Sequence, residues 1–180
     1  MLAVLFSAVF PVPGEAKERP TRDQLLASAF PGCSFERQPR TLTREQMKQV
    51  KKLAGTTPTS PLIFTYRALR ADPTAASKQQ VGTVYFDAHK VRTLPEVLLV
   101  AVNQDGTVRR VEVADFKEPQ EYEADPKWLA QFDKKALSPE LQLKRDVRNL
   151  VGCTLSARAA TDAVRRVLVI DRLLKERPLK

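Results

Sequence analysis

Residues that build common metal and haem sites are scarce in this chain of 180 residues. It has one histidine, His89, and two cysteines, Cys33 and Cys153. A zinc site needs a cluster of Cys or His ligands, and c-type haem attachment needs a Cys-x-x-Cys-His motif, so we expect neither. The two cysteines are compatible with one disulfide in an oxidising compartment, but their spacing does not tell whether they meet. The alternative for Cys33 is a small buried side chain.

Aromatic residues make up 7% of the chain, and none of them lies in residues 143–180. This segment holds ten Lys or Arg against four Asp or Glu, a local balance of +6 out of a formal net charge of +9. Proteins that bind single-stranded nucleic acid interleave basic with aromatic residues, so we expect no nucleic-acid partner. The basic segment instead favours contact with an anionic membrane surface or with an acidic redox partner.

The sequence has no apolar run long enough to span a bilayer. A shorter apolar run, Leu2 to Phe10, lies near the first residue of the sequence. It is followed by Pro-Val-Pro and by the small residues Gly14 and Ala16. This pattern is typical of a secretory signal, so we predict a signal peptide over residues 1–16 and a periplasmic or otherwise exported protein. The alternative is a buried N-terminal strand.

Local patterns predict an α+β fold in a single domain. Thr21 and Thr43 each begin a capping box, and the helices that they start should end at Pro31-Gly32 and at Gly55. We therefore expect a helical segment over residues 17–60. Alternating and β-branched runs predict a mainly antiparallel sheet. Its expected strands cover residues 62–68, 81–86, 96–102 and 107–113.

The last two expected strands flank Asn103-Gln104-Asp105-Gly106, a strong hairpin signal. The doubled Arg109-Arg110 interrupts the alternation of the final strand and indicates a β-bulge. A short helix should follow Asp125 and carry Trp128. A long amphipathic helix should cover about residues 156–174, with the ladder Arg158, Asp162 and Arg166 on its exposed face.

The turn Gly152-Cys153-Thr154-Leu155-Ser156 opens this last helix and is the strongest candidate for a site. The first N–H groups of a helix have no intrahelical partner, and the helix dipole favours negative charge there. A phosphate could therefore bind at this turn, beside the Thr154 hydroxyl. The alternative is that Thr154 or Ser156 only caps the helix.

Residues 151–165 read Val-Gly-Cys-Thr-Leu-Ser-Ala-Arg-Ala-Ala-Thr-Asp-Ala-Val-Arg. They resemble the signature of the FMN-binding domain family, exported flavoproteins that include flavin-carrying subunits of Rnf complexes and of sodium-translocating NADH:quinone reductases. In many members the FMN phosphate forms a phosphoester with the last Thr of a pattern close to Asp-x-x-Ser/Thr-Gly-Ala-Thr, which would be Thr154 here. Gly152 and Thr154 match that pattern, whereas its Asp, Ser/Thr and Ala fall on Arg148, Val151 and Cys153. Upstream segments that also resemble the family are residues 30–32, 42–46, 54–55, 82–86, 89–93, 116–119 and 128–132.

The resemblance implies an FMN-binding domain over residues 61–180, with FMN bound by Gly152, Cys153, Thr154, Leu155 and Ser156. It also implies that Glu118 and Trp128 lie beside the flavin, although Trp128 could simply pack in the core. Arg92 could stabilise the reduced flavin, or it could be an exposed turn residue. His89 could donate to the flavin or to a substrate, or it could be an ordinary loop histidine.

The implied function is that of an electron carrier between redox partners of an envelope electron-transport chain. Covalent attachment at Thr154 would require an FAD:protein FMN transferase. No pair of residues stands out as a substrate-specific acid and base, so we name no catalytic residue and expect an electron-transfer flavoprotein more than a free-standing enzyme. Two alternatives remain: a flavin-free periplasmic accessory or binding module, which the departures from the pattern suggest, and a flavin-dependent reductase with its own small substrate.

Overall fold

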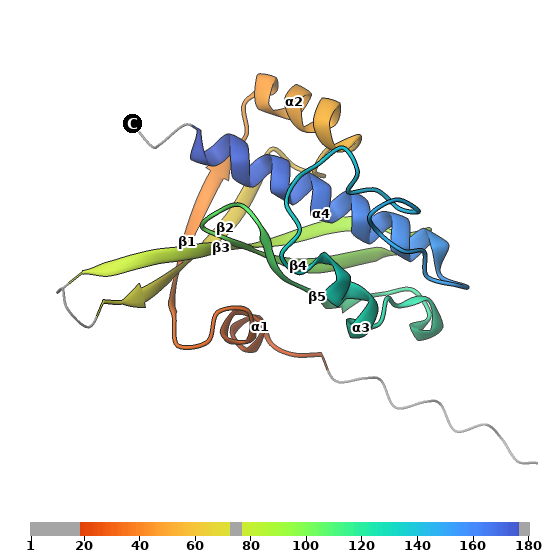
Figure 1. Cartoon of the computed structure of the whole chain (residues 1–180), viewed down its shortest axis with the longest axis horizontal. Coiled ribbons are helices and arrows are strands. Elements are labelled where there is room, and N and C mark those ends of the chain that lie inside the picture. Colours follow the sequence, from red (N-terminus) through yellow and green to blue (C-terminus); the bar gives the residue numbers. More distant parts are fainter. Residues whose placement is uncertain (1–18, 73–76, 177–180) are drawn as a thin grey trace, which may run out of the picture.

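The computed structural model describes residues 19–72 and 77–176 (Figure 1). The expected signal peptide, residues 1–16, lies outside the described residues. In the described part of the chain five strands form one sheet in the order β1-β2-β3-β4-β5, and every neighbouring pair is antiparallel. The strands are β1 (Ser34–Thr41), β2 (Leu62–Ala71), β3 (Lys78–Lys90), β4 (Pro95–Asn103) and β5 (Val108–Phe116).

The helices lie on both faces of this sheet (Figure 1). They are α1 (Arg22–Ala29), α2 (Arg44–Ala54), α3 (Pro126–Leu129) and α4 (Thr154–Lys175), with short 3-10 turns η1 (Gln120–Tyr122) and η2 (Ala130–Phe132). The long helix α4 crosses one face together with α2, and α1 covers the other. The predicted α+β fold, with a mainly antiparallel sheet in a single domain, is confirmed.

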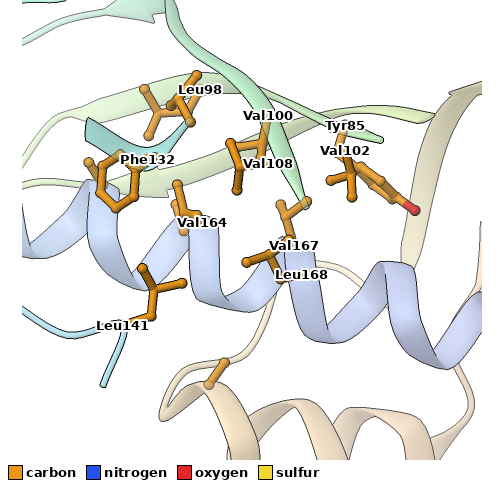
Figure 2. Packing of buried hydrophobic residues seen from close by; sticks show 14 of the residues in the cluster. Tyr85, Leu98, Val100, Val102, Val108, Phe132, Leu141, Val164, Val167 and Leu168 are labelled. Carbon is orange, nitrogen blue, oxygen red and sulfur yellow. The ribbon is translucent and has the colours of Figure 1, made fainter. Parts of the chain in front are cut away.

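The two-residue period of the central strand β4 gives the sheet a core on each face. Leu98, Val100 and Val102 face α4, where they pack with Val164 and Val167 (Figure 2). The alternate residues of β4 point the other way. With α1 they form a second, smaller cluster, which includes Leu25, Leu26, Phe30, Leu99 and Ala101. Because α4 packs on the buried residues of β4, the core sets where its first turn lies.

The capping boxes form as predicted at both N-terminal helices. The Thr21 hydroxyl accepts the Gln24 N–H at 3.3 Å, and the Thr43 hydroxyl accepts the Gln46 N–H at 3.2 Å. Between these helices lies the strand β1, which the local patterns did not predict, so residues 17–60 are not wholly helical. Only Phe35 is a large apolar residue in this strand, and a Pro interrupts it. Such a pattern is tolerated because β1 is an edge strand that pairs only with β2.

The predicted bulge is confirmed in β5. Ala101 pairs with Arg110 and Val102 pairs with Val108, so Arg109 is the extra residue. The bulge turns the Arg109 side chain towards α1, where its Nε donates to the Ala29 carbonyl at 2.6 Å. The bulge therefore ties the last turn of α1 to the far edge of the sheet.

The last helix begins at Thr154, two residues earlier than predicted. The amphipathic pattern predicted for it is seen in a buried apolar face that includes Ala160, Ala163, Val164, Val167 and Ile170. The prediction that Arg166 lies on the exposed face is wrong, because this side chain is 4% exposed and meets Asp87 of β3. Among the described residues, no helix combines the length and the apolar character that a membrane span requires.

Candidate functional site

The first turn of α4 carries no side-chain cap. Cys153 precedes the helix with φ −121° and ψ 37°, which is not the extended backbone typical of a capping residue. Thr154 is the first helical residue, and the Ser156 hydroxyl donates to the Tyr122 carbonyl. The alternative that Thr154 or Ser156 caps the helix is therefore wrong. The N–H groups of the first turn are left for another acceptor.

Gly152 shapes the approach to this turn. Its φ is +79°, in the left-handed region, and a Cβ placed on it would meet nothing within 4 Å. The Thr154 side chain next to it is half-exposed, and its hydroxyl oxygen accepts one long bond, 3.4 Å, from the Asn149 amide. A nucleophilic hydroxyl, open space and uncapped amides thus lie together at the positive end of a helix dipole.

Two further residues of the expected site lie on the η1 side of the same turn. The Cys153 thiol donates to the Glu121 carbonyl at 3.1 Å, which joins the start of α4 to η1. The Arg92 guanidinium lies 5.2 Å from the centre of the Tyr122 ring. Arg92 itself is exposed, in the turn between β3 and β4. The structure therefore brings Arg92 to the same side of the molecule as Cys153 and Ser156.

Glu118 holds the turn that carries Arg92. Its carboxylate accepts the backbone N–H groups of Thr93 and Leu94, both at 2.8 Å. These N–H donors, that of Leu94 first, lower the pKa of Glu118 and keep it ionised. Glu118 therefore fixes the shape of the β3–β4 turn.

Trp128 lies in the core and supports the segment that leads into the site. It packs edge-on against Phe132, with ring centres 5.5 Å apart, and its indole N–H donates to the Arg148 carbonyl at 2.9 Å. The Arg148 N–H in turn donates to Gln131 at 2.8 Å. The two bonds fix the backbone four residues before Gly152, so Trp128 packs in the core and also positions the turn.

His89 lies in β3, so the alternative of an ordinary loop histidine is wrong. Its side chain is 10% exposed and bridges two carboxylates: Nδ1 lies 3.0 Å from Asp87, and Nε2 lies 2.9 Å from Glu96. Burial lowers the pKa of His89, but the hydrogen bonds to Asp87 and Glu96 outweigh it and raise the pKa to about 9. Both ring nitrogens are occupied, which leaves neither free to meet a flavin in this structure.

A charged network surrounds His89, and no local sequence pattern predicted it. Asp87 also binds Arg166 of α4 through two hydrogen bonds, one of them 2.8 Å from Nε to Oδ2. Glu96 is fully buried and is paired with His89 in the β3–β4 register. Acidic residues at inward-facing positions of two apolar strands were the available signal, since buried carboxylates need partners.

The two cysteines, Cys33 and Cys153, are free thiols in this structure, each half-buried. Across the described ranges, no three His, Cys, Asp or Glu residues are grouped so that they could hold a metal ion.

Residues 95–169 match the family model of the FMN-binding domain. The match runs from the first residue of β4 into the second half of α4, and it includes the Gly152 to Ser156 turn. The similarity to the FMN-binding domain family therefore covers β4, β5 and most of α4. A comparison with curated proteins found no match. Strands β1 to β3 lie before the matched residues, and they complete the sheet on which α4 packs.

The residues at the start of α4 fit the phosphate of FMN. The first-turn amides have no cap, the space beside Gly152 is open, and the Thr154 hydroxyl is accessible. An FMN-binding domain needs an anion site of this kind, because backbone N–H groups and the helix dipole both favour phosphate.

Proposed function

We propose that this protein is an exported electron-transfer flavoprotein that holds FMN by a phosphoester to Thr154. The observation that carries the proposal is the uncapped first turn of α4, which presents Thr154 within the matched FMN-binding domain. When bound, FMN supplies the electron chemistry, and the chain supplies binding and orientation. The first-turn amides bind the phosphate, and the Thr154 oxygen holds it permanently.

Covalent attachment in this proposal requires an FAD:protein FMN transferase. Val151, which replaces the Ser/Thr of the family pattern, is 93% exposed, so its side chain contributes almost nothing to the packing. The substitution therefore changes the surface that a transferase meets more than it changes the fold. The acceptor hydroxyl and the glycine before it are kept, which supports attachment at Thr154.

The proposed role is electron relay between redox partners of an envelope electron-transport chain. Among residues 19–72 and 77–176, none near the first turn of α4 forms an acid–base pair suited to a small substrate, and this favours a carrier. Export rests on the signal-like pattern of residues 1–16, and it gives covalent attachment a clear advantage, because a dissociable cofactor would be lost to a dilute exterior. Contact with a membrane surface remains part of the proposal on the charge of the C-terminal segment alone.

Intact-mass analysis of the full chain, co-expressed with an FAD:protein FMN transferase, tests the attachment. We expect a mass increase of one FMN, lost in Thr154→Ala and kept in Thr59→Ala, a control at an exposed threonine outside the site. An increase that persists in Thr154→Ala would place the flavin elsewhere. A colourless protein of unmodified mass, made with a transferase shown to be active, would favour the flavin-free accessory module.

A further inference from the structure

The cations of α4 differ in what they bind. Its described part carries five, and four of them have partners inside the protein. Arg165 donates to the carbonyls of Leu53, Ser138 and Leu141, Arg166 binds Asp87, Arg172 binds Glu176, and Lys175 binds Asp171. Arg158 is the exception: it is exposed and makes no hydrogen bond or ion pair with any described residue.

Arg158 lines a groove of about 510 Å³ beside α4. The groove is bounded by the last turn of α2 and by residues 142–144, and Thr161, Asp162 and Arg165 line it along the helix. Arg158 follows Thr154 by four residues, which places both on one face of the helix, about 6 Å apart along its axis. The groove therefore begins one turn from the proposed flavin anchor.

Two more cations without partners reach this groove from other elements. Lys52 comes from α2, and Lys144 comes from the segment before α4. Neither side chain has a hydrogen bond or an ion pair within the described ranges. The Lys144 backbone has φ +66°, and its N–H donates to the Val147 carbonyl at 2.7 Å, so a fixed turn presents the side chain. Lys52, Lys144 and Arg158 line the groove together with one carboxylate, that of Asp162, so positive charge is in excess there and favours an anion.

We infer that this groove binds a small oxyanion ligand, a carboxylate or a phosphate, through Lys52, Lys144 and Arg158. Its volume is in the range of small-molecule sites. The site is separate from the first turn of α4 and does not depend on the flavin. Its distance from Thr154 places the ligand close to the proposed cofactor.

Asp162 limits which oxyanions the groove can bind. Its half-buried carboxylate lines the same groove and, among the described residues, accepts no hydrogen bond. A carboxylate repels a simple anion but accepts a bond from a hydroxyl group. The groove therefore selects an oxyanion that also carries a donor, such as a hydroxy acid or hydrogen phosphate.

Calorimetric titration of the full chain tests the site with three probes: malate, succinate and inorganic phosphate at low ionic strength. Malate carries a hydroxyl group that succinate lacks, and Asp162 would accept a hydrogen bond from that hydroxyl. We expect saturable binding of malate or phosphate, with malate tighter than succinate, and Asp162→Ala, which removes the acceptor oxygen, should remove that preference. Lys144→Ala and Arg158→Ala should each weaken binding about tenfold, because each removes a charge-assisted hydrogen bond.

Lys127→Ala is the matched control, since Lys127 is exposed, has no side-chain partner among the described residues and lies outside the groove. Binding to this variant should not change. The inference fails if no probe saturates, or if Lys127→Ala weakens binding as much as Arg158→Ala does. The flavin-loaded protein and the Thr154→Ala variant should bind each probe with the same affinity. Binding only to Thr154→Ala would assign the groove to the flavin itself and overturn a separate site.

Discussion

The middle and the start of α4 differ in whether their polar groups have partners within the protein. In the middle of the helix, Arg165 and Arg166 are buried, and each is bound to groups from other elements. At its start, Thr154 is half-exposed, Arg158 is exposed, and the first-turn amides have no cap. The middle of the helix fixes α4 on the sheet, and its start remains open to a ligand.

The difference follows from what burial requires. A buried charge is tolerated only with a well-placed opposite charge and further hydrogen bonds, and Asp87 receives both from Arg166 and His89. An exposed helix end has no such requirement, because water satisfies its amides until a ligand does. Substitutions in the middle should therefore cost stability, and substitutions at the start should cost binding.

The largest expected effect comes from Arg166→Met. It leaves the buried Asp87 carboxylate with His89 as its remaining charged partner, and we expect a loss of about 3–5 kcal/mol in the free energy of unfolding. Denaturant titration measures it. Arg158→Met, the matched change at the open end, should stay within about 0.5 kcal/mol of the parent. Equal losses in the two variants would contradict the contrast between the two stretches.

The pH dependence of stability tests the same network without removing a cation from α4. The pKa of His89 is raised from 6.5 to about 9, so its contribution is fully present below pH 6.5 and is lost as the pH rises through 9. The shift corresponds to about 3 kcal/mol. Denaturant titrations at pH 6 and pH 10 measure the loss.

His89→Gln is the control for other groups that titrate at alkaline pH. It should remove most of the difference between pH 6 and pH 10. Because His89 is the only histidine of the chain, its imidazole signal in a proton NMR titration reports the pKa directly. A titration midpoint near pH 6.5 would show that Asp87 and Glu96 do not raise the pKa of His89.

Local signals explain what the sequence predicted well. The capping boxes at Thr21 and Thr43 and the hairpin at residues 103–106 each lie within a few neighbouring residues, so the sequence pattern carries them directly. The Gly152 to Ser156 turn is a local signal too, since it lies just before an amphipathic helix and resembles a family signature. Its role as the flavin site stays a prediction.

The features that the sequence did not predict depend on contacts between residues far apart in the chain. Arg166 and Asp87 lie 79 positions apart, and no local pattern pairs them. The spacing of Arg158, Asp162 and Arg166 is that of an exposed ladder, yet packing against β3 buries only the last of the three. Strand β1 was missed for a related reason, since its pairing with β2 depends on backbone bonds and not on an apolar pattern.

At the open end of α4, Gly152→Ala should have an intermediate effect. The φ of +79° is unfavourable for any residue with a Cβ, although no neighbour lies within 4 Å of that atom. We expect a loss of about 1–2 kcal/mol in unfolding free energy from the backbone alone. Gly152→Asn should lose less, because Asn adopts this conformation more readily. A larger loss in Gly152→Asn than in Gly152→Ala would mean that a side chain at this position clashes with a neighbour.

The smallest expected effect is that of Cys153→Ser, although serine is among the best capping residues. A cap requires an extended backbone, as at Thr43 with φ −69° and ψ 163°, whereas Cys153 has ψ 37°. The serine hydroxyl would also have the Glu121 carbonyl to bind in place of the thiol. We expect a change within about 0.5 kcal/mol in denaturant titration, against a loss of about 1 kcal/mol for the reference variant Thr43→Ala. A gain of about 1 kcal/mol in Cys153→Ser would mean that the turn can close over its own amides. Those amides would then be unavailable to a phosphate, and flavin loading of the variant should fall with them.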